Sequence, residues 1–374
     1  MELNAISLTA GQPAGKIAIM KITIREVAER ANVSIGTVSR VLNGHPSVSP
    51  QNVDRVRSVV RSINYRPLRR RSKLKEVDGL KGKQIGLVLL AIDRTLASLP
   101  SVASAVHGVE AGLAEQGATT LLINAPDPAV LPAPLELEQL DGVIVKGAMQ
   151  GDLHASLSTS FRKRLADLAC VWIMGRPEGS AGDHVCANDV EVGRLAAEAL
   201  LSHGHRRLAF VNPKADHQLF LRREMSFTWH AERAGAQVTK FVKSTTEQVT
   251  YPLQPVRMTE QVGDLVDALL SARPRPTAVF VPADSVAVLV YRALSERGLK
   301  IGEDVSIVSC NYEPPLIAGV WPDLTTIDIH SEAVGRKAVR VMSERLSGAG
   351  GAIPLEIQLS PSVVAGGSVA KLRR

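Results

Sequence analysis

Residues 23–43 show the clearest periodic spacing of apolar positions near the start of the chain, and this spacing predicts two short helices joined by a tight turn. Ile24, Val27 and Ala28 recur on one face, as an amphipathic helix requires. Ser34 is placed to cap the second helix, because a serine oxygen can accept a hydrogen bond from a free amide of the first turn. In this second helix we expect Val38, Val41 and Leu42 to be buried and Ile35, Gly36, Ser39 and Arg40 to be exposed.

A third helix is predicted over residues 50–64, where valine recurs at helical spacing. Thr23 and Glu26 can form a capping box at the start of the first helix. Three helices in this order are typical of a helix-turn-helix domain, whose second helix lies in the major groove of DNA. On these residues alone, a purely structural helical hairpin remains the alternative.

From residue 83 onward, buried apolar runs alternate with amphipathic stretches, a pattern that predicts parallel sheets with helices on both faces. The predicted strands are 85–90, 119–124, 142–145, 170–174, 208–211, 238–241, 278–281 and 305–309. The predicted helices are 102–116, 161–168, 192–203, 222–234, 260–272 and 285–297. The alternation repeats, so we expect two α/β units in tandem, with a small-molecule site in the crevice at the carboxyl ends of the strands.

Positive charge is concentrated near the start of the chain. Residues 21–83 hold 15 Lys and Arg against 5 Asp and Glu, a net charge of +10, whereas the whole chain carries only +7. The charges within residues 1–20 cancel, so residues 84–374 sum to −3. Such a basic segment is typical of a contact with nucleic acid. Within it, the cations of residues 66–75 also fit a solvated linker.

Several classes of site and location are disfavoured by the sequence. Cys170, Cys186 and Cys310 lie far apart without C-x-x-C spacing, so we expect no disulfide framework, no metal site and no cofactor, and a reducing cytoplasm as the location. No apolar run approaches the roughly 18 residues that a membrane span requires. P-loop, nucleophile-elbow and H-E-x-x-H motifs are absent, so we expect a protein that is not an enzyme.

Residues 27–43 match V-A-x-x-A-x-V-S-x-x-T-V-S-R-V-L-N almost position for position. Shorter matches follow in order: residues 200–207 to H-L-x-x-L-G-H-x-x-I, 298–306 to G-L-x-I-P-x-D-V-S and 322–327 to P-x-L-T-T-I. On these motifs the chain resembles the lactose-repressor (LacI/GalR) family of bacterial transcriptional regulators. The resemblance covers about residues 22–368.

The resemblance implies an all-α helix-turn-helix head followed by a two-lobed α/β effector domain like that of type I periplasmic binding proteins. We expect a disordered or non-native extension at 1–20, with Met20 as the native start, then the head at 21–67, a hinge helix or linker at 68–83, and an effector-binding and dimerisation domain at 84–370. The chain is expected to cross between the lobes near residues 185–188, 311 and 348. The N-lobe would then comprise about 84–186 and 312–347, and the C-lobe about 187–311 and 348–370.

The resemblance also implies which residues contact DNA. Arg40 is able to bind a guanine edge through two hydrogen bonds, and Ile35 is able to touch a thymine methyl group. Leu74 falls at the position of a leucine that the family inserts into the minor groove, although a bulky Arg71 stands where the family usually has alanine. The expected contacts are Thr23, Ser34, Ile35, Gly36, Thr37, Ser39, Arg40, Asn43, Arg69, Arg70, Arg71, Leu74 and Lys75.

Fewer of the family's effector-contacting residues are found at the matching positions of this sequence. Arg223 occupies the arginine position of the family's R-x-x-G-F, with Ser226 in place of glycine, and Asp284 keeps the acid of its N-D pair. Asn311 replaces a carboxylate that commonly accepts sugar hydroxyls, and a neutral amide binds these less strongly. Lys146 follows a predicted strand at the crevice. Together with Arg223 and Asn311, it favours an anionic effector such as a sugar acid or a phosphorylated sugar.

Taken together, the sequence predicts a sequence-specific transcriptional regulator, most simply a repressor, acting as a homodimer on a near-palindromic double-stranded operator. A sugar, sugar acid or sugar phosphate bound between the lobes would modulate its operator affinity, through Lys146, Arg223, Asp284 and Asn311. Two alternatives remain open. One is a ligand-independent regulator with a degenerate cleft, and the other is a non-specific architectural DNA-binding protein.

Overall fold

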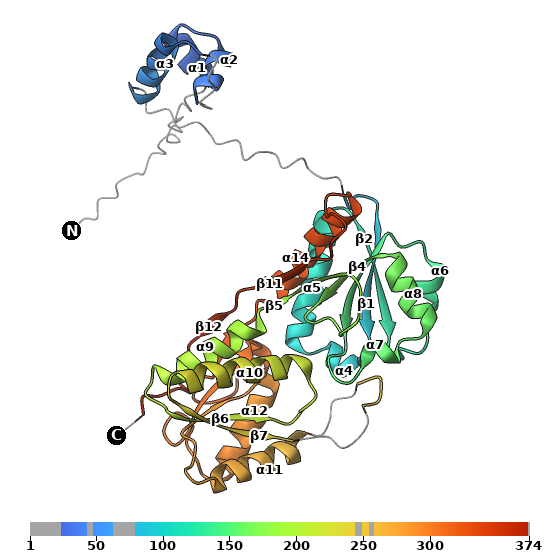
Figure 1. The fold of residues 1–374 in the computed structure, drawn as a ribbon, viewed down its shortest axis with the longest axis vertical. Coiled ribbons are helices and arrows are strands. Elements are labelled where there is room, and N and C mark those ends of the chain that lie inside the picture. Colours follow the sequence, from blue (N-terminus) through green and yellow to red (C-terminus); the bar gives the residue numbers. More distant parts are fainter. Residues whose placement is uncertain (1–23, 43–47, 63–78, 244–248, 254–257, 373–374) are drawn as a thin grey trace, which may run out of the picture. The chain divides into compact units, whose positions relative to one another are not determined.

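The computed structural model describes residues 24–42, 48–62, 79–243, 249–253 and 258–372, and its contacts divide the chain into two compact units, Met1–Lys75 and Glu76–Arg374. In the first unit, α1 (Ile24–Ala31), α2 (Ile35–Leu42) and α3 (Pro50–Ser62) confirm the predicted helix-turn-helix and its third helix (Figure 1). Asn32 turns the chain between α1 and α2 with φ of 50°, a conformation that asparagine tolerates. The small core of this unit comprises Val27, Ala28, Ala31, Val38, Val41 and Val56.

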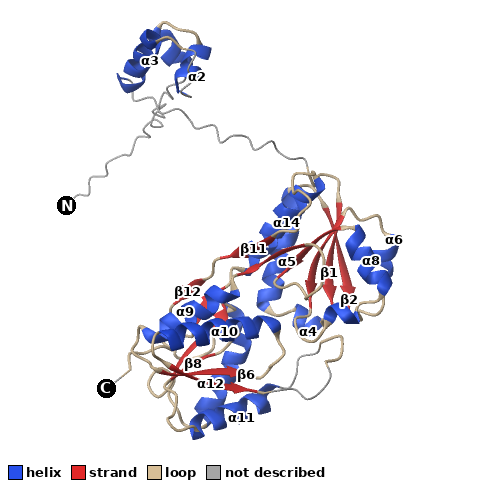
Figure 2. Ribbon diagram, in the orientation of Figure 1, coloured by secondary structure: helices blue, strands red, loops and turns tan. Residues whose placement is uncertain are grey.

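The second unit contains two six-stranded sheets, and it confirms the predicted two-lobed α/β fold (Figure 2). The N-lobe sheet has the order β11-β5-β4-β3-β1-β2. Its strands are β1 (Gln84–Leu90), β2 (Thr119–Ala125), β3 (Gly142–Gly147), β4 (Ala169–Ile173), β5 (Asp183–Ala187) and β11 (Glu356–Leu359). The C-lobe sheet has the order β12-β10-β9-β8-β6-β7. Its strands are β6 (Arg207–Asn212), β7 (Gln237–Val242), β8 (Ala278–Phe280), β9 (Ser306–Asn311), β10 (Thr325–Asp328) and β12 (Ser362–Val364).

Helices cover both faces of each sheet. In the N-lobe these are α4 (Arg94–Ala97), α5 (Pro100–Glu115), α6 (Ala133–Leu137), α7 (Leu153–Ser156), α8 (Thr159–Asp167) and α14 (Ser331–Leu346). In the C-lobe they are α9 (Asp189–Leu201), α10 (Gln218–Arg233), α11 (Met258–Ser271), α12 (Asp284–Glu296) and α13 (Pro314–Ile317). Along β1, Ile85 and Leu87 pack with α5 and α14, whereas Val88 and Leu90 belong to the cluster that contains Phe161 of α8. A strand buried on both faces reads as a continuous apolar run, which is why the sequence revealed it.

Two of the three predicted crossings between the lobes are wrong in position. The first is confirmed, because β5 ends at Ala187 in the N-lobe sheet and α9 packs on α10 in the C-lobe. The second does not occur at Asn311, because β10 pairs with β9 and keeps the chain in the C-lobe until α14 begins at Ser331. The third does not occur at Gly348, because β11 still pairs with β5 of the N-lobe and only β12 returns to the C-lobe.

The closest contact between two helices of the N-lobe joins α5 to α14. A Cβ atom on Gly335 of α14 would lie 2.1 Å from the carbonyl oxygen of Ala105, and one on Gly108 of α5 would lie 2.1 Å from that of Glu332. The two helices therefore touch through their backbones, which only glycine permits. This contact fixes α14, the first element after the second crossing, on the N-lobe.

Candidate functional sites: an exposed helix and a cavity between the lobes

Helix α2 presents one face to solvent and is anchored by the other. The amide of Thr37 donates to Ser34 Oγ at 3.1 Å, so Ser34 caps the helix as predicted. Val38 and Val41 are buried in the core, as expected. Because the apolar side of α2 is fixed in this way, its other side is held in a defined orientation for an external partner.

The exposed face of α2 carries Ile35, Gly36 and Arg40. Ile35 keeps 44% of its surface accessible, which is unusual for an isoleucine, and the space beside Gly36 is open apart from the nearby Ser34 hydroxyl. Thr37 is half-buried, and only the backbone of Ser39 is described. The remaining predicted DNA contacts lie outside the described residues: Thr23, Asn43, Arg69, Arg70, Arg71, Leu74 and Lys75.

A cavity of about 130 Å³ lies between the lobes, where the sequence predicted the crevice. Its wall includes Lys146 from β3, Lys214 just after β6 and Asn311 at the end of β9, so both sheets contribute the carboxyl ends of their strands. Much of the rest is apolar, with Leu96, Leu99, Val102, Met149, Phe220 and Leu253 among the lining side chains. The cavity thus combines a few polar groups with apolar walls, as small-molecule sites do.

Beside this cavity, backbone hydrogen bonds hold Leu253, from the segment between β7 and α11, on the N-lobe, and a further bond joins α10 to the N-lobe. The amide of Leu253 donates to Ala91 O at 2.8 Å, and the amide of Asp93 donates to Leu253 O at 3.1 Å. Further along the cleft, the amide of Gln218 donates to Met149 O at 3.0 Å. The lobes are therefore in contact around the cavity.

Arg223 and Asn311 are brought together as the sequence predicted, but Arg223 is not a free cation. Its Nε donates to Asp189 Oδ1 at 2.7 Å, and its Nη1 donates to Asn311 Oδ1 at 3.0 Å and to Pro282 O at 2.7 Å. The Arg223 and Asp189 side chains are only 3% and 6% exposed. Sequence reasoning missed Asp189 as a partner. Asp189 is the first residue of α9, directly after the Asn188 cap, and from there its carboxylate accepts the Arg223 hydrogen bond.

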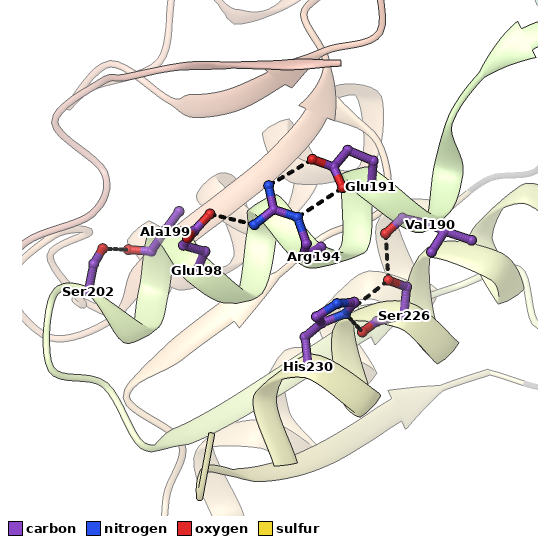
Figure 3. Close-up of polar contacts among 8 residues, drawn as sticks. All are labelled: Val190, Glu191, Arg194, Glu198, Ala199, Ser202, Ser226 and His230. Carbon is purple, nitrogen blue, oxygen red and sulfur yellow. Dashed lines mark hydrogen bonds and ion pairs between the residues drawn. The ribbon is translucent and has the colours of Figure 1, made fainter. Parts of the chain in front are cut away.

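Helix α10, which carries Arg223, is held tightly on α9 (Figure 3). Ser226, the residue that replaces the glycine of the family motif, donates its hydroxyl to Val190 O at 2.5 Å and lies beside the His230 ring. The close approach that glycine normally permits is supplied by Gly193 of α9, where a Cβ atom would lie 2.5 Å from Arg223 O. The exchange of glycine for serine on α10 is thereby accommodated, and Arg223 stays fixed.

Asp284 does not line the cavity, so its predicted role as a direct effector contact is not supported by its position. Its side chain is fully buried at the start of α12 and accepts hydrogen bonds from Thr326 Oγ1 at 2.7 Å and from the Glu313 amide at 2.8 Å. Burial raises the pKa of this carboxyl to about 6. With both oxygens engaged, Asp284 positions Glu313, which does line the cavity.

Lys146 lies within β3 and not after it, and its side chain is only 8% exposed. Its Nζ donates to the neighbouring Gly147 O at 2.6 Å, and among the described residues it has no carboxylate partner. Burial lowers the pKa of its ammonium group to about 8. Lys146 therefore lines the cavity as a cation with little internal compensation.

The further polar residues of the cavity wall that were missed from the sequence include Lys214, His217 and Glu313. Lys214 follows strand β6 by two residues, the same strand-end signal that identified Lys146. His217 precedes α10 and stacks on Phe220 with ring centroids 3.9 Å apart. Glu313 follows a chain reversal after β9, and no local pattern marks it.

One cluster in the described residues has ligand atoms close enough to hold a metal ion. His184, Cys186 and Glu356 place one ligand atom each within 4.8 Å of one another at the edge of the N-lobe sheet. The guanidinium of Arg176 lies 3.8 Å from the Glu356 carboxylate. Because that guanidinium occupies the carboxylate and repels a cation, we assign the cluster to the packing of β5 and β11.

Within the described ranges, no helix is both long enough and apolar enough to cross a bilayer.

The two family matches fall in the two different units of the fold. Residues 23–67 match the family of bacterial regulatory proteins called lacI, and residues 197–369 match the periplasmic binding protein-like domain. The chain is 29% identical over 331 residues to the HTH-type transcriptional repressor PurR of Aliivibrio fischeri (strain MJ11), covering 87% of this chain and 91% of that protein. It is 27% identical over 333 residues to the HTH-type transcriptional regulator CelR of Thermobifida fusca, covering 87% and 92%.

Solved structures share the fold over most of the chain. A complex of the transcriptional regulator CelR with cellobiose matches with a TM-score of 0.60 at 23% identity, covering 93% of this chain and 99% of that chain. The lac repressor dimer bound to operator and the anti-inducer ONPF matches with a TM-score of 0.59 at 19% identity and the same coverage. At these identities the match establishes a common architecture, in which a helix-turn-helix head precedes a two-lobed domain.

Proposed function

Since this chain belongs to the lacI family of bacterial regulatory proteins, we propose that it is a transcriptional regulator that binds a specific operator and responds to a small molecule held between its lobes. The observation that carries this proposal is the combination in one chain of a capped helix with an exposed face, α2, and a lined cavity between two lobes. Its relatives are transcriptional repressors and regulators, and we infer that it too acts by binding and not by catalysis.

Base reading is assigned to the exposed face of α2. Arg40 provides the planar pair of donors that recognises a guanine, and Ile35 provides an apolar surface for a thymine methyl group. Thr23, Ser34, Gly36, Thr37, Ser39 and Asn43 are proposed as further DNA contacts. The basic run at Arg69, Arg70, Arg71 and Lys75 is proposed to bind phosphates, and Leu74 to enter the minor groove.

Dimerisation follows from the same recognition geometry. A single head reads only one half-site, and two heads related by a two-fold axis read a near-palindromic operator. The similar lac repressor structure is a dimer bound to operator. We propose the same assembly for this chain, most simply as a repressor.

The cavity is proposed to hold the effector, with Lys146, Arg223 and Asn311 on its wall and Asp284 behind it. The similar CelR structure holds cellobiose, which supports a sugar or a sugar derivative as the class of ligand. Binding would change how the lobes contact each other and so change operator affinity, a coupling of about 1–3 kcal/mol in typical allosteric proteins.

Replacement of Arg40 by alanine tests directly whether this residue recognises operator bases. Arg40→Ala should lower the ratio of operator to random-DNA affinity by roughly tenfold, because a bidentate contact to one base is worth about 1–3 kcal/mol. Fluorescence anisotropy on a selected operator and a scrambled duplex measures this ratio. Arg292→Ala, which removes an exposed arginine on α12, is the matched control and should leave the ratio unchanged. Equal ratios in both variants would assign Arg40 to non-specific binding, as in an architectural DNA-binding protein.

A ligand-independent regulator is the second candidate, and three observations favour it. The lobes are joined by direct hydrogen bonds, Arg223 is paired with Asp189, and the cavity measures only about 130 Å³. If operator affinity stays constant across a panel of neutral, acidic and phosphorylated sugars that also fail to shift the melting temperature, this second candidate replaces the first.

A further inference from the structure

The cavity wall carries groups of both charges, and some of their polar atoms have no partner in the protein. Lys146, Lys214 and His217 supply its basic groups. No carboxylate within the described residues pairs with either lysine, and His217 Nδ1 is buried without a hydrogen-bond partner. After burial itself, the charges of Lys214 and Lys146 are the main causes that hold the pKa of His217 well below its usual range, so the three groups lie close together.

Glu313, on the same cavity wall, offers an acceptor. It is only 1% exposed, and its Oε1 accepts hydrogen bonds from the Ser101 hydroxyl at 2.6 Å and the Ser101 amide at 3.1 Å. Its Oε2 is buried and has no partner, and neither has the hydroxyl of Ser331, another residue of the cavity wall. Buried polar groups are normally satisfied, so these atoms indicate where a bound molecule would supply donors.

Much of the rest of the wall is apolar, and the space is small. Leu96, Leu99 and Phe220 are among the lining side chains. The volume of about 130 Å³ is close to that of an engineered protein cavity of about 150 Å³ that binds benzene. This space therefore favours a ligand smaller than a disaccharide.

We propose that the effector is a small acid whose anionic group lies against Lys146, Lys214 and His217 and whose hydroxyl or ammonium group donates to Glu313. This inference rests on the proposed effector function and names the class of ligand. The sequence predicted an anion bound by Lys146 together with Arg223, and the structure changes the second partner, because Arg223 is already neutralised by Asp189. A neutral sugar would leave two lysines unpaired in the cavity.

The assignment of the anion is tested by matched ligands that differ in charge. Isothermal titration calorimetry on the full-length protein compares glycerol, glycerate and glycerol 3-phosphate, and then ribose, ribonate and ribose 5-phosphate. We expect at least one acid to bind with an affinity roughly tenfold to a hundredfold above that of its neutral partner, as charge-assisted hydrogen bonds imply. The two acid series separate a carboxylate from a phosphate as the anion.

Variants at Lys214 and Glu313 test whether these residues cause the preference for acids over neutral ligands. Lys214→Gln should lower acid affinity by roughly tenfold or more and leave neutral ligands unaffected, whereas Lys300→Gln, at an exposed lysine of the C-lobe, should change neither. Glu313→Gln should reduce the preference for glycerate over propionate, which lacks the hydroxyl, while circular dichroism shows an unchanged fold.

Three results would overturn the inference: tighter binding of neutral sugars than of acids, equal losses in Lys214→Gln and Lys300→Gln, or no binding by any member of the panel. The first two leave the proposed regulator intact, because a ligand still occupies the cleft. The third result, if operator affinity is also unchanged by every member of the panel, would instead favour the ligand-independent regulator.

Discussion

Lys146 occupies an unfavourable position for a charged side chain. Burial without a carboxylate partner disfavours its ammonium form, and its pKa falls from 10.5 to about 8. The folded protein therefore binds this proton less tightly than the unfolded chain does. The corresponding destabilisation at neutral pH is on the order of 3 kcal/mol. A buried charge that lowers stability and lines a cavity is expected where the protein retains that charge to bind a ligand.

Replacing Lys146 by methionine should therefore raise stability and abolish acid binding together. The gain in unfolding free energy should be complete below about pH 8 and should shrink as pH rises toward 10.5, because over that window wild-type Lys146 loses its proton in the folded state and stability rises with pH. Thermal unfolding at pH 7 and at pH 10, with Lys300→Met as the control, measures the effect. A lower melting temperature for Lys146→Met at pH 7 would contradict it.

The sequence located several cavity residues but not their pairing. Lys146 was found because it comes at the carboxyl end of an apolar run, and Lys214 carried the same signal. Arg223 was identified by its motif, yet its neutralisation by Asp189 depends on how α9 packs on α10, which no local pattern specifies. Asp284 likewise kept the expected position in the motif while its oxygens are used by Thr326 and Glu313.

Helix α14 depends on two glycines for its contact with α5. Because the backbones touch at Gly108 and Gly335, this packing tolerates no side chain at either position. Glycine within a helix normally costs about 1 kcal/mol relative to alanine. Its presence in both helices at their point of contact therefore reflects packing and not propensity.

Gly335→Ala should destabilise the effector domain by roughly 2 kcal/mol or more, because its Cβ would lie 2.1 Å from Ala105 O and force the helices apart. Gly263→Ala on α11 is the matched control, since the nearest atom there is 3.8 Å away. This control should stabilise by about 0.5–1 kcal/mol through helix propensity. Urea unfolding of both variants measures the difference, and the same sign for the two substitutions would argue against backbone contact between α5 and α14.

Most long elements were predictable and the shortest ones were not. The strands that are buried on both faces and the helices α5, α8, α9, α10, α11 and α12 were expected from periodicity, but the 16-residue helix α14 was missed. Strands β10 and β12 contain only 4 and 3 residues, too few to show a period, and they decide where the chain crosses between the lobes. The predicted crossings at Asn311 and Gly348 failed for this reason.

Charge is divided between the two units of the molecule. Residues 21–83 carry a net charge of +10, while residues 84–374 sum to −3. The basic segment is therefore expected to dominate non-specific attraction to DNA, and the effector domain to contribute little to it.

Replacing Arg69, Arg70 and Arg71 by alanine should flatten the dependence of DNA affinity on salt. Each lost phosphate contact should reduce the slope of log affinity against log salt by roughly one unit. Anisotropy titrations over a series of salt concentrations measure the slope, and a triple Lys/Arg→Ala variant at Arg273, Arg292 and Lys300 in the C-lobe controls for net charge. An unaltered slope would mean that the basic run is a linker that makes no phosphate contacts.

The most direct measurement is an anisotropy titration of full-length protein on operator duplexes selected from random DNA, with and without the small acid that binds most tightly. The proposed regulator should bind selected duplexes in preference to scrambled ones, and the acid should change that affinity by about fivefold to a hundredfold in either direction. Protein that ignores every duplex at low ionic strength, or whose operator affinity is the same with the acid bound, would contradict this function.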